Sequence, residues 1–332
     1  MPTDSLIRVY GHTWVQQMLQ DVVLSGRTSH AYLFVGPDQI GKTTLARAFA
    51  QAITCESPVA NDGLGACGQC RACRLAAEGG HPDHRFVEPS NGQIKIEAIR
   101  NLIREANLTP IEGRYKVFVI QSFDRSNPSA ANALLKTLEE PSETTRILLT
   151  SSQSVSLLPT ITSRCQVLHL RPVPVRDVSA ILQAGWGMAA ERADLLADLS
   201  GGRIGWAIQL GTEPELWQVH EQRLDKIKEL VQQDVVERMA YSQRLATASD
   251  IEETLREWLV WWRDVLMIQR GCDELIVNRD QIETVRQMAK LSNPGDVRRF
   301  MGALMETAGY LRRNVNVRLA IEALLLKLPR AT

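Results

Sequence analysis

Residues 36–43 read GPDQIGKT and match the phosphate-loop pattern G-x-x-x-x-G-K-[ST]. Glycines in such a loop let backbone N–H groups turn towards phosphate, and the helix that follows adds the positive end of its dipole. Lys42 is placed to meet the outer phosphates, and Thr43 to offer its hydroxyl to Mg²⁺. The pattern favours binding of ATP or ADP with Mg²⁺ over an ordinary glycine turn with an exposed lysine. The expected binding residues are Gly36, Gly41, Lys42, Thr43 and Thr44.

Hydrolysis of a nucleotide needs carboxylates, and the sequence lacks them where they are expected. A phosphate-loop ATPase normally has an acidic residue at the tip of a neighbouring strand to hold Mg²⁺, and often a second one to position water. The candidate strand is 117–120, and its tip reads Gln121, Ser122 and Phe123. We expect Asp124, in the next turn, to cap a helix or to meet solvent. The chain is therefore not expected to be an active ATPase alone, and an acid from another strand remains the open alternative.

A cysteine cluster is the second group of residues that could do chemistry. The clustered cysteines are Cys55, Cys67, Cys70 and Cys73. Four thiolates with two short C-x2-C spacings are typical of a tetrahedral structural zinc site. They lie in an insertion, about residues 55–80, with little apolar content, so bound metal would supply folding energy. An iron–sulfur cluster and free thiols are the alternatives. We expect the nearby His81 and His84 at the surface rather than as ligands.

The triplet Ser163-Arg164-Cys165 opens the last apolar run of the first 170 residues. By itself, an arginine at a strand edge indicates a solvated charge or a salt-bridge partner.

The elements that must position these residues alternate between short apolar runs and helical patterns, which predicts an α/β domain with a mostly parallel sheet. The expected strands are 31–35, 85–88, 117–120, 147–150 and 165–170, and the expected helices are 42–53 and about 129–139. Strand 31–35 leads into the phosphate loop, and helix 42–53 follows it. Pro172 and Pro174 end the last strand and mark a boundary.

Beyond Pro174 the strand signal disappears. Residues 175–211 carry two or three short helical patterns, broken by Gly185, Gly187, Gly201, Gly202 and Gly205. Longer amphipathic stretches follow at 216–233, 250–269, 279–290, 294–314 and 318–328. Three tryptophans, Trp258, Trp261 and Trp262, have the spacing of one buried helix face. The chain should therefore contain an α/β domain, a small helical domain and a larger helical domain.

The composition excludes several classes of protein. With 332 residues, 44% of them apolar, the chain is neither a single small domain nor disordered throughout. Lys+Arg and Asp+Glu are 38 each, so no global charge draws the chain onto DNA or an anionic membrane. No apolar run is long enough to span a membrane and the first residues lack a secretory signal, so we expect a cytoplasmic protein without a membrane partner.

Several motifs together resemble the bacterial DNA polymerase III clamp-loader subunits. They are HAYLF at 30–34 running into the phosphate loop, the four-cysteine insertion, ANALLKTLEEP at 131–141, the Ser163-Arg164-Cys165 triplet and NVNVRLA at 314–320. The resemblance spans the chain and implies an AAA+ nucleotide-binding domain at 1–172, a helical lid domain at 173–212 and an all-α collar domain at 213–332. Through such collars, five subunits form an open ring that uses ATP to load a sliding clamp onto primed DNA.

Two departures distinguish the kinds of subunit within this family. The gamma/tau motor has an acidic pair at the strand tip and a lid arginine after Gly-Ser, whereas delta-prime subunits commonly lack part of this machinery. Here the tip reads Gln121-Ser122, and Ile204 stands where the lid arginine would fall. These departures favour the delta-prime kind, and an ATP-hydrolysing gamma-type motor or another AAA+ ATPase is the alternative.

The resemblance also assigns roles and partners. It implies that Arg164 is an arginine finger that acts in trans on the nucleotide of the adjacent subunit. Ser151 either senses the γ-phosphate or simply ends its strand. The implied partners are the gamma/tau and delta subunits, with the sliding clamp and primer-template DNA contacted through the complex. Zinc is expected as a structural cofactor at the four cysteines.

Overall fold

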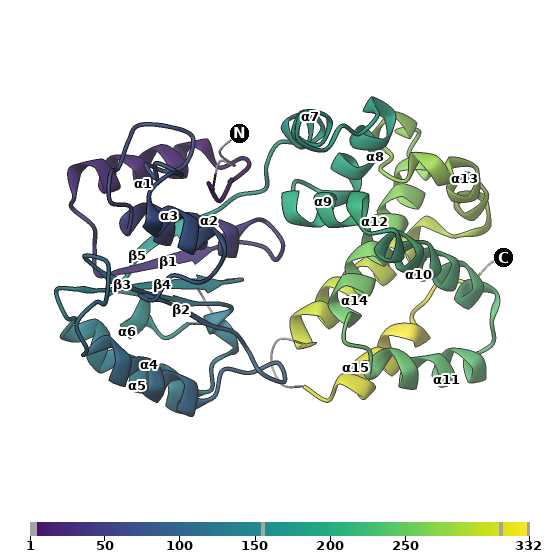
Figure 1. Ribbon diagram of the computed structural model, residues 1–332. Helices are drawn as coiled ribbons and strands as arrows, with labels where there is room; N and C mark the ends of the chain where they lie inside the picture. Colours follow the sequence, from purple (N-terminus) through teal and green to yellow (C-terminus); the bar gives the residue numbers. More distant parts are fainter. Residues whose placement is uncertain (1–4, 154–156, 312–314, 331–332) are drawn as a thin grey trace. The chain divides into compact units, whose positions relative to one another are not determined.

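The structure is a computed structural model that describes residues 5–153, 157–311 and 315–330. The chain divides into two compact units (Figure 1). The first unit comprises Met1–Ile181 and Gly201–Trp206, and the second comprises Leu182–Ser200 and Ala207–Thr332. The domain boundaries expected at residues 172 and 212 remain predictions.

A five-stranded parallel sheet forms the centre of the first unit. Its strands are β1 (Ala31–Val35), β2 (His84–Val87), β3 (Lys116–Ile120), β4 (Thr145–Ser151) and β5 (Gln166–His169). The order across the sheet is β2-β3-β4-β1-β5, and all four neighbouring pairs run parallel. β1 therefore lies between β4 and β5, and the phosphate loop begins at its carboxyl end.

Helices cover both faces of this sheet, as a parallel sheet requires. They are α1 (Thr13–Ser25), α2 (Lys42–Ile53), α3 (Arg71–Ala77), α4 (Ile96–Ala106), η1 (Phe123–Arg125), α5 (Pro128–Glu139) and α6 (Pro159–Thr162). Alternate residues of β1 face opposite cores: Tyr32 and Phe34 pack with α1 and α2, while Leu33 packs with α4 and α5. Figure 1 shows α1–α3 on one side of the sheet and α4–α6 on the other. Because both faces are covered, all five residues of β1 are buried.

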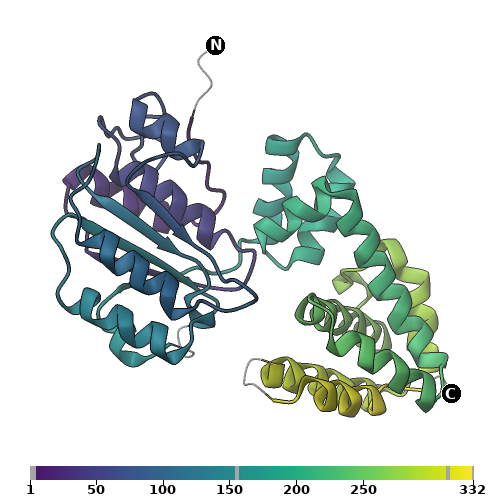
Figure 2. The same ribbon diagram turned by 60° about the horizontal axis from the view of Figure 1, so that its bottom comes forward.

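The remaining elements are helical. α7 (Val175–Trp186) and α9 (Ile204–Thr212) are each divided between the two units. The second unit adds α8 (Ala190–Ser200), α10 (Pro214–Gln232), α11 (Val235–Ala246), α12 (Ile251–Gln269), η2 (Asp273–Leu275), η3 (Arg279–Gln281), α13 (Ile282–Leu291), α14 (Pro294–Leu311) and α15 (Val317–Leu326). Figure 2 shows these helices, green to yellow, with no strand among their described residues.

Three tryptophans form the centre of the helical core of the second unit. Trp258, Trp261 and Trp262 of α12 are each fully buried. The ring of Trp262 meets that of Phe300 from α14 edge to face, with centroids 5.7 Å apart. The expected single buried face of this helix is therefore confirmed.

The expected architecture is confirmed in the described residues: an α/β unit with a parallel sheet, followed by helices alone. Most element ends differ from expectation by one to three residues. Gly185 and Gly205, expected to break helices, lie inside α7 and α9. The end expected at Asn314 for the helix from residue 294 falls outside the described residues, as does Asn314 of the NVNVRLA motif. None of the described helices is long and apolar enough to cross a membrane.

Candidate functional site

The phosphate loop connects β1 to α2, as the pattern predicts. Gly36 must be glycine, because a Cβ there would come within 2.6 Å of the carbonyl oxygen of Leu170. Gly41 has φ 100°, which favours glycine, and α2 begins directly after it. Thr43 is half-buried and Thr44 is exposed at the first turn of α2. Their expected contacts with nucleotide and Mg²⁺ stay predictions.

Lys42 is held inside its own loop. Its Nζ donates hydrogen bonds of 2.7 Å to the carbonyl oxygens of both Gly36 and Pro37, and it lies 3.5 Å from the Asp38 carboxylate. Burial lowers the pKa of Lys42, and the charges of Asp38 and Asp124 act in the opposite direction. The exposed lysine expected for an ordinary glycine turn is therefore not present, and nucleotide binding stays a prediction.

Two contacts that the sequence did not predict brace the loop from outside. The buried His12 ring hydrogen-bonds through Nε2 to the carbonyl oxygen of Ile40, at 2.9 Å. At the start of α9, the N–H of Gly205 donates to the carbonyl oxygen of Gln39, at 2.8 Å. The buried Ile204, which stands where a lid arginine was sought, has a methyl group 4.0 Å from the place a Cβ on Gly41 would take. An apolar side chain therefore lies against the phosphate loop at this point.

At the strand tips, neutral side chains outnumber acids. Gln121 follows β3 and donates from Nε2 to Oε1 of Glu88, which follows β2, at 2.6 Å. Ser122 has φ 47°, and its N–H donates to the hydroxyl of Thr150 on β4. Ser151 is the last residue of β4, and its buried hydroxyl donates to the carbonyl oxygen of Gln153. The tip of β3 itself thus carries no carboxylate, as the sequence indicates.

Of the two environments expected for Asp124, the helix cap is wrong, and the side chain is only half-buried. It does not cap α5, because the Asn127 side chain does so by accepting from the N–H of Ala130. Its carboxylate instead accepts from the hydroxyl of Ser152 at 2.5 Å and from the N–H of Ser152 at 3.3 Å. Burial lowers the pKa of Lys42, and the charge of Asp124 opposes this lowering less than Asp38 does. The Asp124 carboxylate, beyond the tip of β3, is therefore bound to the segment that follows β4.

The four cysteines come together although they span the insertion. The Sγ atoms of Cys55, Cys67, Cys70 and Cys73 all lie within 4.8 Å of one another. The pairs Cys55–Cys70 and Cys67–Cys73 are 4.0 and 3.9 Å apart. Four sulfurs bound to zinc at about 2.3 Å in a tetrahedron would be about 3.8 Å apart. The geometry therefore fits a tetrahedral metal site.

Backbone groups support thiolates in this cluster. The N–H groups of Cys67, Cys70 and Cys73 donate to the sulfurs of Cys55, Cys67 and Cys70 at 3.3, 3.3 and 3.4 Å. A hydrogen bond with the Cys73 side chain lowers the pKa of Cys55 to about 5, and the same contact raises the pKa of Cys73. A bound cation would release the protons of the thiols that still carry them.

His81 and His84 are not at the surface, contrary to expectation. They are 2% and 5% exposed, and their rings stack with centroids 4.2 Å apart. Nε2 of His84 hydrogen-bonds to the hydroxyl of Thr54 at 3.0 Å. Burial lowers the pKa of both rings, that of His84 to about 3. The pair therefore packs as neutral rings.

Arg164 lies near the amino ends of the strands, whereas the phosphate loop lies at their carboxyl ends. It precedes β5 by two residues, and Gln166 of β5 pairs with Tyr32 of β1, four residues before Gly36. At about 3.3 Å per strand residue, the backbones of Arg164 and Gly36 are about 20 Å apart along the strands. Arg164 therefore cannot serve the phosphate loop of its own chain.

The guanidinium of Arg164 is held by a partner that the sequence did not indicate. Nη2 pairs with Oε1 of Glu139, at the end of α5, at 2.8 Å, and Nη1 donates to the carbonyl oxygen of Thr160 at 2.8 Å. Both side chains of the ion pair are partly exposed, 34% for Arg164 and 48% for Glu139. Burial raises the pKa of the neighbouring Cys165 to about 12, so this thiol stays protonated.

Comparison with known proteins gives two matching family models. Residues 11–174 match the model described as DNA polymerase III, delta subunit, and residues 214–329 match DNA polymerase III, delta subunit, C terminal. The DNA polymerase III subunit delta' of Bacillus subtilis (strain 168) is 31% identical over 319 residues, which cover 95% of each chain. The subunit delta' of Pseudomonas aeruginosa is 37% identical over 231 residues, 68% of each chain. The subunit tau of Escherichia coli (strain K12) is 35% identical over 170 residues, which are 51% of this chain and 26% of tau.

Proposed function

The chain belongs to the family of DNA polymerase III delta' subunits, and from this premise we propose that it is a clamp-loader subunit that lends Arg164 to a neighbour. The loader, part of the DNA polymerase III holoenzyme, uses ATP to open a sliding clamp and close it around primed DNA. This chain binds nucleotide statically, and the hydrolysis that it supports takes place in the adjacent subunit.

The observation that carries the proposal is the separation of the two cations of the site. Lys42 lies in the phosphate loop at the carboxyl edge of the sheet, and Arg164 lies at the amino edge, about 20 Å away along the strands. A partly exposed guanidinium at that edge could exchange Glu139 for the phosphates of another subunit. There it would stabilise the charge that develops on the transferred phosphoryl group.

The phosphate loop of this chain would hold ATP or ADP. Backbone N–H groups from Gly36 to Thr44 would surround the phosphates, Lys42 would exchange its carbonyl partners for phosphate oxygens, and Thr43 would face Mg²⁺. The neutral tip formed by Gln121 and Ser122 leaves the attacking water without a carboxylate at that strand. Nucleotide binding without turnover follows from this arrangement.

The four cysteines would hold one Zn²⁺, which supplies a structural cross-link rather than chemistry. The Cys55–Cys70 and Cys67–Cys73 sulfur distances, 4.0 and 3.9 Å, support this choice. The insertion would fold around the ion because it has little apolar core of its own. Elemental analysis of the purified chain should give one zinc atom per chain, and iron in its place would contradict the proposal.

The partners follow from the family. We assign the chain to a complex with gamma/tau and delta subunits, with the sliding clamp and primer-template DNA reached through that complex. Its place would be the cytoplasm, where the bacterial chromosome is copied.

The experiment that tests the proposal replaces Arg164 by alanine in a reconstituted loader. Removing an arginine finger slows its site by about 10³-fold or more, so turnover at the one adjacent site should disappear while the other sites remain active. Arg176→Ala is the control, because this substitution removes the same charge from an exposed side chain elsewhere on the chain. Unchanged DNA-stimulated ATP turnover by the Arg164→Ala loader would rule the finger out.

A second candidate function is that of a working ATPase, and the position of Asp124 favours it. Its carboxylate lies just beyond the tip of β3, and its charge partly opposes the burial that lowers the pKa of Lys42. Steady ATP turnover by the isolated chain, lost in both Lys42→Ala and Asp124→Asn, would establish this function. ATP turnover at background level would exclude this second function and favour a site that binds nucleotide without hydrolysing it.

A further inference from the structure

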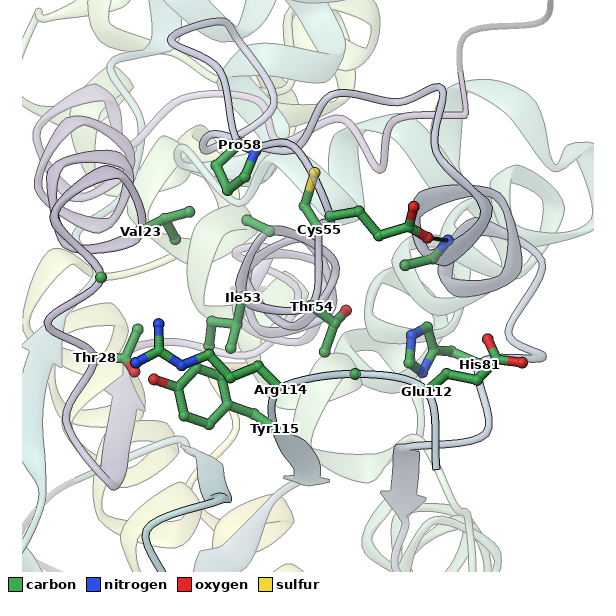
Figure 3. Close-up of a pocket in the computed structure, with 15 residues that line it drawn as sticks. Val23, Thr28, Ile53, Thr54, Cys55, Pro58, His81, Glu112, Arg114 and Tyr115 are labelled. Carbon is green, nitrogen blue, oxygen red and sulfur yellow. Dashed lines mark hydrogen bonds between the residues drawn. The ribbon is translucent and has the colours of Figure 1, made fainter. Parts of the chain in front are cut away.

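A pocket of about 370 Å³ lies at the amino edge of the sheet, away from the phosphate loop and beside the cysteine insertion (Figure 3). The segments that precede β1 and β3 form one side of it, and the end of α2 forms another. Its apolar wall is made by Val23, Ile53, Pro58 and the ring of Tyr115. Polar groups lie at both ends of this wall: arginines at one end, and a histidine with nearby carboxylates at the other.

Arginines make one end positive. The guanidinium of Arg114 lies over the Tyr115 ring at 5.1 Å, and that of Arg146 lies over the same ring at 3.9 Å. Arg146 donates to the hydroxyl of Thr28 at 2.8 Å. Figure 3 shows the Arg114 guanidinium next to Thr28 and the Tyr115 hydroxyl. Neither arginine has a carboxylate partner in residues 5–153, 157–311 and 315–330. This end therefore attracts an anion.

A buried histidine marks the other end. Nδ1 of His81 accepts from the N–H of Asp83 at 3.1 Å, so Nε2 carries the proton of the neutral ring. Nε2 is buried and has no hydrogen-bond partner within the described part of the chain. A buried donor without an acceptor is costly. The pocket thus offers a neutral N–H to an acceptor from outside the chain.

The carboxylates near this histidine already have partners. Glu112 pairs with Arg71 at 3.0 Å, and Glu56 accepts from the N–H of Ala72 at 3.2 Å. Asp83 accepts from three backbone N–H groups between 2.6 and 2.8 Å. An acceptor at His81 that faces these negative groups should be an uncharged carbonyl rather than a second carboxylate.

We propose that this pocket binds an N-acylated amino acid unit with an apolar side chain. The carboxylate lies at Arg114, the side chain lies against Val23 and Ile53, and the acyl carbonyl accepts from Nε2 of His81. The buried Arg146 adds positive charge at this end but does not line the pocket. Both a free N-acyl amino acid and the carboxyl terminus of a peptide carry this chemistry. The volume, at the lower end of the 300–1,000 Å³ typical of ligand pockets, suits one such unit rather than a nucleotide.

The test uses the full chain with its metal retained and the probe N-acetyl-L-leucine, followed by calorimetry and by NMR shifts. A ligand of this size is expected to bind with a Kd in the millimolar range. The neutral analogue N-acetyl-L-leucinamide should bind at least about tenfold more weakly, because it lacks the charge-assisted contact. An equal affinity of the two probes would overturn the proposal, as would the absence of binding by the acid at tens of millimolar.

Two variants locate the site. Arg114→Gln removes an exposed charge and should weaken N-acetyl-L-leucine at least about tenfold. Arg104→Gln, an exposed arginine on α4, is the matched control and should leave the affinity within twofold. If Arg114→Gln binds as the wild type does, the site is refuted. His81→Phe keeps a ring against His84 and should weaken both the acid and the amide, because the two share the carbonyl contact.

The two sources of the ligand are separated by a third probe, the peptide acetyl-Ala-Ala-Ala-Leu with a free carboxylate. Binding at least about tenfold tighter than that of N-acetyl-L-leucine assigns the pocket to a peptide terminus, and equal binding assigns it to a small free acid. Both results retain the proposed chemistry. Binding of the amidated peptide as tight as that of the free peptide would contradict it.

Discussion

Lys42 and Arg164, the two cations of the candidate sites, are both held by neighbouring oxygen atoms. Lys42 donates to the carbonyl oxygens of Gly36 and Pro37, and Arg164 pairs with Glu139. A phosphate must replace these oxygens before either cation can act on it. At Arg164 the replacement costs little, because ion pairs between exposed groups are worth about 0.2–1 kcal/mol. Glu139 can therefore aim the guanidinium without trapping it.

Replacing Glu139 by glutamine tests this aiming role. The side chain keeps its shape but loses the charge that fixes Nη2 of Arg164. We expect the ATP turnover of the adjacent subunit to fall about twofold to fivefold in a reconstituted loader, through kcat rather than KM. Glu140→Gln, one residue further along, is the control. Faster turnover by Glu139→Gln would mean that the carboxylate restrains the finger, and unchanged turnover would mean that the pair is incidental.

The buried imidazole of His84 gives a prediction for acid stability. Burial lowers its folded-state pKa to about 3, below the ordinary value of 6.5. Between these two values the unfolded chain binds the extra proton, so stability is complete above pH 6.5 and is lost as the pH falls towards 3. At pH 4.5 the loss should be about 2–3 kcal/mol.

Denaturant unfolding at pH 7.5 and pH 4.5 measures this effect. His84→Phe keeps an aromatic ring against His81 and removes the titrating group, so the part of the pH dependence that belongs to His84 should disappear. An identical loss of stability in the wild type and in His84→Phe would show that other groups cause it.

Single residues were predictable where the chemistry is local in sequence. The phosphate loop and the cysteine spacing can each be recognised from a short stretch of sequence, and in the structure the four sulfurs lie together. The partner of Arg164 was not predictable, because Glu139 is 25 positions away and the contact depends on how α5 and β5 meet the same edge. The burial of His81 and His84 was missed because a histidine carries no local signal of exposure.

At the scale of elements, the first turn of α9 contacts the phosphate loop. The N–H of Gly205 reaches the carbonyl oxygen of Gln39 at 2.8 Å, and a Cβ at this position would come within 2.7 Å of the same oxygen. Local propensity predicted a helix break here, since glycine in a helix costs about 1 kcal/mol relative to alanine. The close approach of two backbones explains why glycine is nevertheless used.

Gly205→Ala should therefore displace the phosphate loop. We expect nucleotide affinity to fall about tenfold and stability by about 1–3 kcal/mol, because the clashing atom belongs to the backbone and cannot rotate away. Gly302→Ala in α14 is the matched control: nothing lies within 4 Å of its Cβ, so it should add up to about 1 kcal/mol of stability and leave nucleotide binding unchanged. Calorimetric titration with ADP and thermal unfolding measure both quantities. Unaltered affinity in Gly205→Ala would show that α9 does not support the loop.

Some helices could be predicted from the sequence and others could not. The expected range 42–53 is that of α2, because the loop glycine fixes its start. No helix was expected at α11, although Asp234 and Glu237 form a capping box there that marks its first turn. The buried face of this helix includes Arg238 and Ser242 beside Leu245, so apolar spacing does not mark it.

At the scale of the whole molecule, each unit has cores of its own, and no core cluster contains residues of both. We expect calorimetry to resolve two unfolding transitions, as is common for multidomain chains. Removal of the metal by a chelator should lower only the transition of the first unit. Trp262→Ala should lower only that of the second, by about 3–5 kcal/mol in stability.

Trp14→Ala is the control for the tryptophan variant, because Trp14 is 55% exposed and should change stability little. One cooperative transition that both treatments shift together would contradict the independence of the two units.

The opposite edges of the sheet give the subunit a polarity. A chain that gives a guanidinium on one side and holds phosphates on the other joins its neighbours through unlike surfaces, which is a heterologous contact and not a twofold one. In an open row of such members, one end has a nucleotide loop that no arginine faces. A subunit whose β3 tip lacks a carboxylate does not hydrolyse ATP, so an arginine finger from a neighbour would not accelerate any reaction at its site. We therefore expect this chain to occupy that terminal place.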